Sequence, residues 1–275
     1  MGEPKASAEF LELCDLIHRV SGIKLDNGKR QLVRSRLSTH LRESGDQSLA
    51  DYMARLRDDR SGSETSMLVD LISTNVTSFF REQHHFEHLA GTVLEERHAT
   101  GRSDVFRAWS AASSSGEEPY SIAMTLAQAL GSDKLRRFLI LATDISTRMV
   151  ERAEQGSFDM RALATVRPER RNRWFDSDGD GGGRVKQGLR DRVRARHLNL
   201  MGPWPMKKRF DVIFCRNVLI YFDQPTIQRL IHRFHDQLEP GGYLYIGHSE
   251  SLSQIEHPFE YAGPTIYRRP HAGLP

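Results

Sequence analysis

The sequence predicts an α/β protein in which a mostly parallel sheet with covering helices follows a small all-helical domain. Up to about residue 100, apolar residues recur at three- and four-residue spacing, which is typical of amphipathic helices. Beyond Gly101, short β-rich runs alternate with helix-length segments, which is typical of a parallel sheet. Between Arg161 and Arg196 the acidic, glycine-rich stretch 176–183 interrupts this order and predicts a small β insertion.

Four groups of apolar residues predict the helices of the first domain, because their spacing puts the apolar side chains on one helix face. The groups lie within residues 10–20, 32–41, 49–56 and 67–72. The second group runs beside a basic stripe of Arg30, Arg34 and Arg42. The segment Asn75 to Glu82 then joins this domain to the sheet, although a simple capping turn would also fit its polar residues.

Seven β-rich runs predict the strands, the last two as a closing antiparallel hairpin. The runs are Val105 to Ser110, Phe138 to Ile145, Val193 to Leu200, Phe210 to Arg216, Tyr243 to His248, Phe259 to Tyr261 and Ile266 to Arg268. Helices are predicted between them at Pro119 to Leu130, Ser146 to Gln155 and Pro225 to Leu238. A turn is predicted at 239–242, since a proline near the start and a Pro-Gly-Gly stop match the asymmetry of helix ends.

The composition excludes several classes of protein. The 275 residues hold no apolar run close to the 18 or so of a membrane-spanning helix. The first residues, MGEPKASAEF, lack the pattern of a secretory signal or a myristoylation site. The two cysteines, Cys14 and Cys215, form neither a disulfide framework nor a zinc-type pair. We therefore expect a soluble protein in a reducing, cytoplasmic compartment.

The charge is distributed unevenly along the chain. The formal net charge is 39 − 36 = +3, whereas the stretch Arg19 to Arg42 carries 7 − 1 = +6 and the stretch Arg161 to Arg196 carries 11 − 5 = +6. The remainder must therefore be net acidic. Local fields of one sign speed the encounter with partners of the other sign, but basic residues that only decorate a solvated face would give the same count.

The residues just after each strand are the candidates for chemistry, because open parallel sheets bind ligands beyond the carboxyl ends of their strands. After the first strand, small residues at 110–116 precede Glu117 and Glu118 at a helix start. Small residues let a backbone approach a ligand closely. The two acids disfavour a phosphate and favour a ligand with a cationic amine or sulfonium group. The alternative is a serine-rich turn with capping acids.

Two further strand ends carry candidate binding residues. Asp144 ends the second strand, where a carboxylate can accept hydrogen bonds from two ribose hydroxyls. A helix N-cap is an equally supported interpretation of Asp144. After the third strand, Asn199 and Leu200 offer one amide and an apolar cover, which suits a small ring.

No metal site is predicted. His84, His85 and His88 are the histidines close enough together to be considered, and His84 and His88 are spaced to share a helix face. No third ligand is evident in the sequence beside them, and Glu87 is not at the second position that the H-E-x-x-H pattern requires. We expect these histidines on a solvated helix face, and Cys215 in the core.

Six ordered segments of the chain carry a resemblance to a known family. They are TNVTSFFRE (Thr74 to Glu82), WSAASSSGEEPYSIAM (Trp109 to Met124), ATDIS (Ala142 to Ser146), LNL (Leu198 to Leu200), FDVIFCRNVLIYFD (Phe210 to Asp223) and LEPGGYLYIGHSESL (Leu238 to Leu252). In order and spacing they resemble the chemotaxis receptor methyltransferases of the CheR family. The resemblance spans roughly residues 8 to 270, and its specificity comes from the number of segments.

The resemblance implies a class I S-adenosylmethionine-dependent methyltransferase fold, a seven-stranded, mostly parallel sheet with an antiparallel last strand. Residues 1–85 would form an N-terminal helical receptor-docking domain, and 86–275 the methyltransferase domain with a β-subdomain inserted at about 165–197. The implied activity is protein-glutamate O-methylation, which makes γ-glutamyl methyl esters on the cytoplasmic domain of methyl-accepting chemotaxis receptors. This receptor domain would be the partner of a monomeric enzyme, with no nucleic acid and no membrane insertion.

Matching motifs also imply roles for individual residues. Arg81 would orient the acceptor carboxylate and Tyr221 would stand close to the transferred methyl, which makes both candidate catalytic residues. The stripe of Arg30, Arg34 and Arg42 would dock the glutamate-rich receptor helices. The residues implied to contact S-adenosylmethionine, or its product S-adenosylhomocysteine, are Asn75, Thr77, Arg81, Glu117, Glu118, Asp144, Asn199, Leu200, Arg216 and Asn217.

Two other functions stay open, and a departure from the family pattern favours the first of them. Val76 stands where many relatives carry glutamate, so any positioning role of that glutamate is absent here. The chain could therefore be a signalling module that keeps the cofactor but has lost transfer activity. A nucleic-acid methyltransferase is the second alternative, since Asn217 to Tyr221 faintly matches an N-P-P-Y loop, although the prolines are absent and the spacing is one residue longer.

Overall fold

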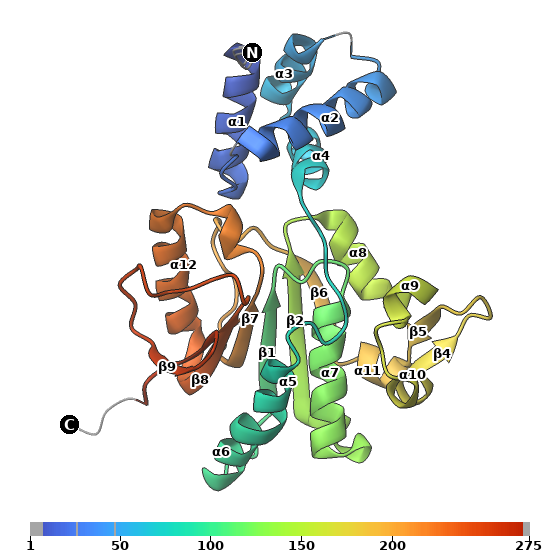
Figure 1. The fold of residues 1–275 in the computed structure, drawn as a ribbon, viewed down its shortest axis with the longest axis vertical. Helices are drawn as coiled ribbons and strands as arrows, with labels where there is room; N and C mark the ends of the chain where they lie inside the picture. The colour runs from blue at the N-terminus through green and yellow to red at the C-terminus, as the bar shows by residue number, and fades with distance from the viewer. Residues whose placement is uncertain (1–7, 26, 47, 272–275) are drawn as a thin grey trace.

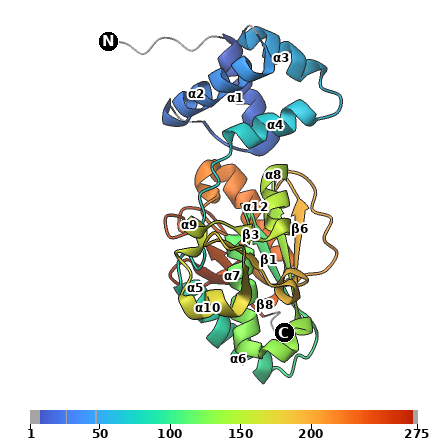
Figure 2. The ribbon, with the colours of Figure 1, turned by 90° about the vertical axis from the view of Figure 1, so that its right-hand side faces the viewer.

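The chain folds into two lobes joined at a narrow waist (Figures 1 and 2). The structure is a computed structural model that describes residues 8–271 except 26 and 47, and only the backbone of 27–29 and 132–134. Within these residues, no helix is both long enough and apolar enough to cross a membrane. The upper lobe consists of helices α1 (Ala8–Ser21), α2 (Asn27–Ser44), α3 (Leu49–Asp58) and α4 (Ser63–Ile72).

The upper lobe is held together by the apolar faces that the sequence predicts. Tyr52 of α3 and Leu68 of α4 are almost fully buried in one cluster with residues of α1 and α2. Arg36 of α2 adds a polar contact, because its Nη1 donates to the carbonyls of Leu71 and Ser73 at 2.9 Å each. These carbonyls lie at the end of α4, where a helix leaves acceptors without intrahelical partners.

The lower lobe is built on a seven-stranded sheet, which confirms the predicted fold class. In spatial order its strands are β6 (Val193–His197), β2 (Phe138–Asp144), β1 (Phe106–Ala111), β7 (Phe210–Cys215), β8 (Leu238–Ile246), β10 (Ile266–Arg268) and β9 (Glu260–Gly263). Strand β10 pairs antiparallel with β8 and β9, and the other pairs are parallel. The strand order reverses between β1 and β7, the kind of switch point at which such sheets bind ligands.

Helices cover both faces of this sheet. On one face, α12 (Gln224–Gln237) packs through Leu230, Ile231 and Phe234 against β7 and β8. The other face is covered by α5 (His84–His88), the π-helix η1 (Leu89–Val93), α6 (Leu94–Ala99) and α7 (Glu117–Leu130). The 3-10 helix η2 (Ser132–Arg137) leads into β2, and α8 (Thr147–Gln155) packs against β2 and β6.

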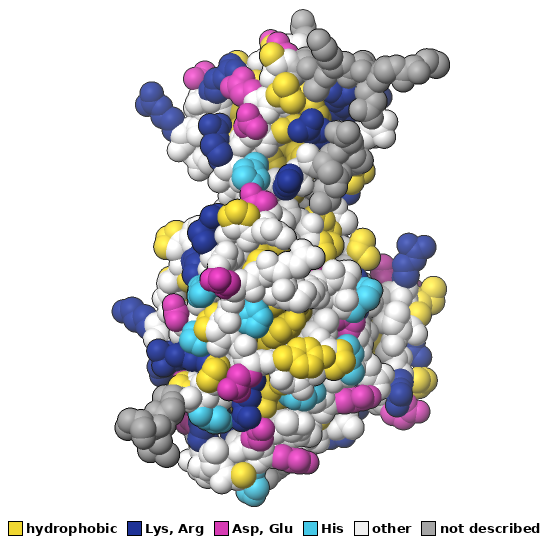
Figure 3. All heavy atoms as spheres, turned by 60° about the vertical axis from the view of Figure 1, so that its left-hand side comes forward, with side chains coloured by type: hydrophobic (Ala, Val, Ile, Leu, Met, Phe, Trp, Pro, Cys, Tyr) yellow, Lys and Arg dark blue, Asp and Glu magenta, His cyan; other side chains and the backbone are white. Residues whose placement is uncertain are grey.

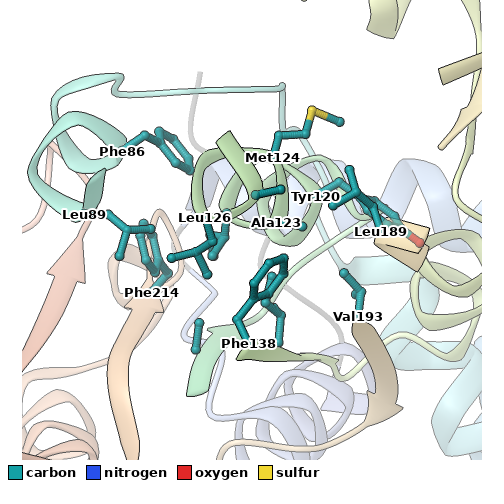
Figure 4. Close-up of a cluster of buried hydrophobic side chains, with 14 of the residues drawn as sticks. Phe86, Leu89, Tyr120, Ala123, Met124, Leu126, Phe138, Leu189, Val193 and Phe214 are labelled. Carbon is teal, nitrogen blue, oxygen red and sulfur yellow. The ribbon is translucent and has the colours of Figure 1, made fainter. Parts of the chain in front are cut away.

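The larger core lies under α7. In Figure 4, Ala123 and Leu126 of α7 lie near Phe138 of β2 and Phe214 of β7. Successive residues of β7 alternate between the two faces of the sheet, since Phe214 joins this core while Ile213 joins the α12 side. A central strand that is buried on both faces needs a nearly continuous apolar run, which is how the sequence predicts β7.

A second sheet of three short strands stands beside α7. Its order is β3 (Ser157–Phe158), β5 (Gly183–Val185), β4 (Phe175–Ser177), with both pairs antiparallel, and it carries the helices α9 (Met160–Leu163), α10 (Pro168–Trp174) and α11 (Gln187–Arg190). Its first strand, β3, lies before the predicted insertion. The sequence does not predict this strand, because two residues are too few to produce a strand pattern. Val193–His197 is strand β6 of the main sheet. The division of the chain into domains stays a prediction.

The predicted turn at 239–242 is wrong, because these residues lie within β8. Helix α12 ends at Gln237 and the strand begins at the next residue. Gly241 takes φ +79° and its N–H donates to the carbonyl of Arg269, so the chain after β10 pairs with this stretch. The pairing of β7 with β8 shifts between Phe210 and Val212, and the Pro-Gly-Gly sequence therefore forms a bulge in the strand.

The histidines of α5 are not all on a solvated face. His84 is exposed, but His85 is fully buried, and its Nε2 lies 2.8 Å from Thr265 Oγ1. Nδ1 of His88 lies 2.9 Å from the hydroxyl of Tyr245. Among the residues that the structure describes, no group of three or more His, Cys, Asp or Glu side chains is arranged to hold a metal ion.

We expect buried His85 to make the stability of the protein depend on pH. Burial, with the nearby Arg216 guanidinium, lowers its pKa from 6.5 to about 3. Below pH 6.5 the unfolded chain therefore binds a proton at this histidine that the folded chain does not bind. The free energy of unfolding is thus unaffected by the protonation of His85 above pH 6.5 and decreases as the pH falls from 6.5 toward 3. The replacement His85→Phe keeps a ring beside Tyr245 and should flatten the dependence by up to about 1.4 kcal/mol per pH unit.

Denaturant unfolding of both proteins between about pH 7.5 and 5 measures this difference. His84→Gln, at the exposed neighbour, is the matched control and should leave the slope unchanged. Equal slopes for wild type and His85→Phe would contradict the assignment.

Candidate active site

A pocket lies at the waist, between the upper lobe and the carboxyl ends of β1, β2 and β7. One wall comes from the upper lobe, at the end of α1, the first half of α2 and the end of α4. The segment 73–78 between the lobes forms a second wall. The floor is made by the residues that follow β1, β2, β6 and β7. The pocket therefore lies where the sheet topology predicts a ligand.

The loop after β1 bends sharply along the floor. Ala112 and Ser114 have φ of +62° and +51°, left-handed conformations that are unfavourable for residues with a side chain. Ser114 Oγ donates to the carbonyl of Asn75 at 3.0 Å, which ties this loop to the segment between the lobes. Gly116 allows close packing on α8, because a Cβ there would lie 3.0 Å from Ala153 Cα.

Asp144 lies at the end of β2, buried in the floor. Its Oδ2 accepts from the N–H of Ser114 at 2.8 Å and its Oδ1 from the N–H of Ser146 at 2.9 Å. Burial raises its pKa, although these two N–H groups oppose the shift. The N-cap of α8 is Ser146, whose hydroxyl accepts from Met149, so Asp144 does not fill that role. A carboxylate has about four acceptor positions, and Asp144 therefore retains capacity for ligand hydroxyls.

The segment between the lobes is anchored by two phenylalanines. Phe79 packs on rings of the small sheet, and the N–H of Phe80 donates to Ser121 Oγ of α7 at 3.0 Å. Arg81 follows directly and lines the pocket, and its Nη1 donates to the carbonyl of Val76 at 3.2 Å. The side chain of Val76 is 78% exposed, so this residue contributes to the pocket mainly through its backbone.

Arg216 directly follows the central strand β7 and is buried between two carboxylates. Its side chain is 2% exposed, with Nη1 3.0 Å from Glu118 Oε2 and Nη2 3.3 Å from Glu82 Oε2. Nη2 also donates to the backbone carbonyl of Arg81. Glu118 accepts a further hydrogen bond from Ser110 Oγ at 2.6 Å. The start of α7, the end of β7 and the segment between the lobes therefore meet at one guanidinium.

The two carboxylates around Arg216 have opposite pKa shifts. Burial acts to raise the pKa of Glu82, but the Arg216 guanidinium and the N–H groups of His248 outweigh it and lower this pKa to about 2. Burial raises the pKa of Glu118, although Arg216 and Ser110 oppose the shift. Glu118 lines the pocket, and a cation bound beside it would favour its ionised form.

The turn after β7 carries Asn217 and Tyr221 to the pocket. Asn217 has φ +58°, and the 3-10 helix η3 (Leu219–Tyr221) follows. The N–H of Lys24, in the upper lobe, donates to the carbonyl of Tyr221 at 2.8 Å. The upper lobe is therefore attached directly to the turn that presents Tyr221.

Asn199 makes a second contact between the lobes. Its Nδ2 donates to the carbonyl of Val20 at 2.6 Å, and its Oδ1 accepts from the N–H of Met201 at 2.9 Å. Asn199 and Leu200 both line the pocket. Both ends of the Asn199 amide are engaged within the chain, which leaves one N–H and one acceptor position of Oδ1 for a ligand ring.

The pocket brings together most of the residues that the sequence singles out. Glu117 does not line it, and its Oε2 instead accepts from Ser115 Oγ at 2.6 Å. Arg30, Arg34 and Arg42 lie on α2 and do not line it either. The candidates that do line it are Asn75, Thr77, Arg81, Glu118, Asp144, Asn199, Leu200, Arg216, Asn217 and Tyr221.

The wall from the upper lobe is absent from the sequence predictions. Ile23, Leu25 and Val33 line the pocket, while Leu25 and Val33 also belong to the core cluster of the upper lobe. Apolar residues at helical spacing look the same whether they face a core or a ligand. Gly22 is the one available signal, since its φ of +74° turns the chain after α1 toward the lower lobe.

The lining suits a nucleoside joined to a cationic group. Asp144 keeps acceptor positions for hydroxyls, the loop of small residues at 112–116 leaves room for a ligand, and Glu118 favours positive charge. S-adenosylmethionine has this chemistry, because it carries a ribose, a sulfonium and an ammonium group. The residues present therefore fit this cofactor.

Two family models match the chain one after the other. Residues 8–73 match the all-alpha domain of CheR methyltransferase, and residues 75–268 match the SAM binding domain of CheR methyltransferase. The boundary between the two matches falls at the segment that joins the lobes.

Curated relatives are similar over nearly their whole length. A probable chemotaxis protein methyltransferase of Rhizobium etli is 44% identical over 265 residues, which cover 94% of this chain and 98% of the relative. The chemotaxis protein methyltransferases of Klebsiella aerogenes and Escherichia coli are 41% and 40% identical, over 96% and 95% of this chain and 90% and 91% of theirs. The chain therefore belongs to the CheR methyltransferase family and is an S-adenosylmethionine-dependent methyltransferase.

Proposed function

We propose that this enzyme methylates glutamate side chains on the cytoplasmic domain of methyl-accepting chemotaxis receptors and forms γ-glutamyl methyl esters. The observation that carries the proposal is that five of the six segments that resemble the family, distant in sequence, contribute residues to one pocket. The names of the relatives as chemotaxis protein methyltransferases support the assignment to chemotaxis. Since the methylated part of such receptors is cytoplasmic, the enzyme would act in the cytoplasm.

Each side of the cofactor has a proposed partner in the pocket. Asp144 would accept hydrogen bonds from the ribose hydroxyls through its unused acceptor positions. Glu118 would lie beside the cationic methionine portion, with Glu117 supporting the same helix start from behind. Asn75 and Thr77 on one side, and Arg216 and Asn217 with Asn199 and Leu200 on the other, would form the walls.

Transfer to a carboxylate makes small demands on acid or base catalysis. The side chain of a solvent-exposed glutamate has a pKa of about 4.3 and is already ionised at neutral pH. The bound cofactor supplies an activated methyl group and is released as S-adenosylhomocysteine. The chain must therefore place the acceptor oxygen in line and exclude water.

Arg81 and Tyr221 are the residues that we propose for this positioning. One N–H of the Arg81 guanidinium is engaged by the Val76 carbonyl, and the guanidinium has five N–H donors in all, enough for an acceptor carboxylate as well. Tyr221 is held from above by the backbone of Lys24 and would fix the approach to the methyl group. Val76 stands where many relatives carry glutamate, but its backbone carbonyl still accepts from Arg81. Because Arg81 is held in this way without the glutamate, we favour an active enzyme over a binding module.

The basic stripe of α2 is proposed to dock the receptor helix that carries the acceptor. Arg42 is exposed, whereas Arg34 lies 4.4 Å above the ring of Phe10 and Arg30 donates to the carbonyl of Leu25. Figure 3 shows Lys and Arg side chains over the upper lobe, interspersed with Asp and Glu. A glutamate-rich helix would meet the stripe above the pocket, with the enzyme as a monomer.

Incubation of the wild-type enzyme with labelled S-adenosylmethionine tests the proposed function. We expect base-labile methyl ester on a receptor cytoplasmic fragment and no label on RNA or DNA, because the pocket is proposed to meet an ionised carboxylate. A fragment whose acceptor glutamates are replaced by alanine is the control. Label on nucleic acid, or cofactor binding without transfer to any of the three, would reject the proposal.

Removal of the positioning groups should slow transfer. We expect Arg81→Ala to lower kcat on receptor fragment by about 100-fold and Tyr221→Phe by about tenfold, because misplacement of reacting groups by about 1 Å has effects of this size. Initial rates at saturating cofactor measure the change, with Arg148→Ala on the exposed face of α8 as the control. If both variants keep the wild-type rate, the two residues do not have these roles.

Docking through α2 should depend on charge. We expect Arg42→Glu to raise the KM for receptor fragment several-fold at low salt and to reduce its dependence on ionic strength, with kcat little changed. The matched control is Arg60→Glu, at an exposed arginine of the same lobe outside α2. Equal effects of the two variants would show that general charge, and not the stripe, attracts the receptor.

A further inference from the structure

Glu250 is a buried carboxylate just behind the pocket, and its function is not explained by the site described above. It follows β8, has 7% of its surface exposed and does not line the pocket. A lone carboxylate in such a place is costly unless hydrogen-bond donors surround it. Its partners therefore indicate what it does.

The partners of Glu250 are backbone N–H groups, three of them in the turn that presents Tyr221. Oε2 accepts from the N–H of Asn217 at 3.0 Å and from that of Gly247 at 2.5 Å. Oε1 accepts from the N–H of Ile220 at 3.3 Å, and the N–H of Leu219 adds a further interaction. One side chain therefore holds both ends of the turn after β7 through donors that lie about 30 residues away in the sequence.

Two neighbouring features also restrain the same turn. Glu82 Oε1 accepts from Asn217 Nδ2 at 3.4 Å and from the N–H of His248 at 3.1 Å. Gly247 lies against Asn217 so closely that a Cβ on it would be 2.8 Å from the Asn217 backbone nitrogen. Asn217 itself is held at φ +58°, a conformation that the surroundings must enforce.

We propose that Glu250 is a positioning residue for methyl transfer, which fixes the turn 217–221 and thereby the place of Tyr221 at the pocket. This inference rests on the proposed function, in which Tyr221 stands beside the methyl group. Glu250 acts through backbone donors of the turn and does not itself line the pocket. Its loss should therefore disturb geometry more than cofactor affinity.

The substitution Glu250→Gln is the sharpest perturbation, because it keeps the size of the side chain and replaces one acceptor oxygen by an amide that faces backbone donors. Asp211→Asn is a matched control. Asp211 is also a buried carboxylate that accepts from a backbone N–H, that of Arg107 at 2.7 Å, and it pairs in addition with the guanidiniums of Arg97 and Arg102 at 2.6 and 3.0 Å. It lies near the start of β7, at the opposite end of that strand from the turn that Glu250 holds. Both variants replace a buried carboxyl group by an amide of nearly the same size.

The full-length chain is assayed for three properties. These are kcat with receptor fragment, the Kd for S-adenosylhomocysteine by calorimetry, and amide hydrogen exchange of residues 216–221. For Glu250→Gln we expect kcat to fall by about 10- to 100-fold, Kd to rise by at most about fivefold and exchange to increase in this segment. For Asp211→Asn we expect a lowered Tm with wild-type kcat and wild-type exchange at 216–221.

Three results would overturn the proposal. They are a wild-type kcat for Glu250→Gln, an equal loss of kcat in both variants, or unchanged exchange at 216–221. If Glu250→Gln does not fold, Gly247→Ala displaces Asn217 with the carboxylate intact and must give the same loss of kcat. If the wild type makes no receptor ester, the proposed function fails on its own, and the exchange comparison still decides whether Glu250 holds the turn.

Discussion

The pocket depends on the burial of a single cation, the guanidinium of Arg216 at the end of the central strand. A guanidinium taken out of water without counter-charges would cost several kcal/mol. Its two carboxylates come from places distant in the sequence, Glu82 from the segment between the lobes and Glu118 from the first turn of α7. The need to satisfy Arg216 therefore brings together three segments, and the residues beside them in sequence become the walls of the pocket.

Backbone strain is concentrated around the same pocket. Among the residues that the structure describes, six residues other than glycine have positive φ values. Of these six, Thr265 alone lies away from the segments that form the pocket. Strain of this kind costs about 1–3 kcal/mol per residue and persists only where contacts enforce it. At Phe80, Ser114 and Asn217 those contacts are hydrogen bonds that their N–H groups donate. The acceptors are the side-chain oxygens of Ser121, Asp144 and Glu250. The strained residues beside the pocket are Phe80, Glu82, Ala112, Ser114 and Asn217.

The fold and the floor of the pocket follow from periodicity, because a strand end can be located from where an apolar run stops. Asp144, at the end of β2, and Asn217, shortly after β7, are predictable in this way. The sequence cannot predict whether Glu117 or Glu118 faces the pocket. Both residues begin the same helix, and only the packing of α7 decides which of them lines the pocket. Glu250 is less predictable still, because its partners are about 30 residues away and its sequence resembles a polar surface turn.

The sequence does not predict the pocket wall from the upper lobe or the bulge in β8, and the two failures have a related reason. Leu25 and Val33 have the spacing of core residues and serve as core and wall together. Pro-Gly-Gly is a good helix stop, and only the pairing of Gly241 with the chain after β10 keeps this stretch in the sheet. Both outcomes are set by long-range packing, which overrides local sequence preference.

The attachment of the lobes would couple the proposed docking on α2 to the proposed positioning by Tyr221. The upper lobe is fixed to the lower one by Lys24 N–H on the Tyr221 carbonyl and by Asn199 on the carbonyl of Val20. The first of these bonds ends on the turn that Glu250 holds from behind. A force on α2 from a docked acidic helix would therefore reach Tyr221 through backbone hydrogen bonds and bypass the extended segment between the lobes. Because these bonds use main-chain atoms at positions 20, 24 and 221, ordinary side-chain substitutions at those three positions leave the bonds in place.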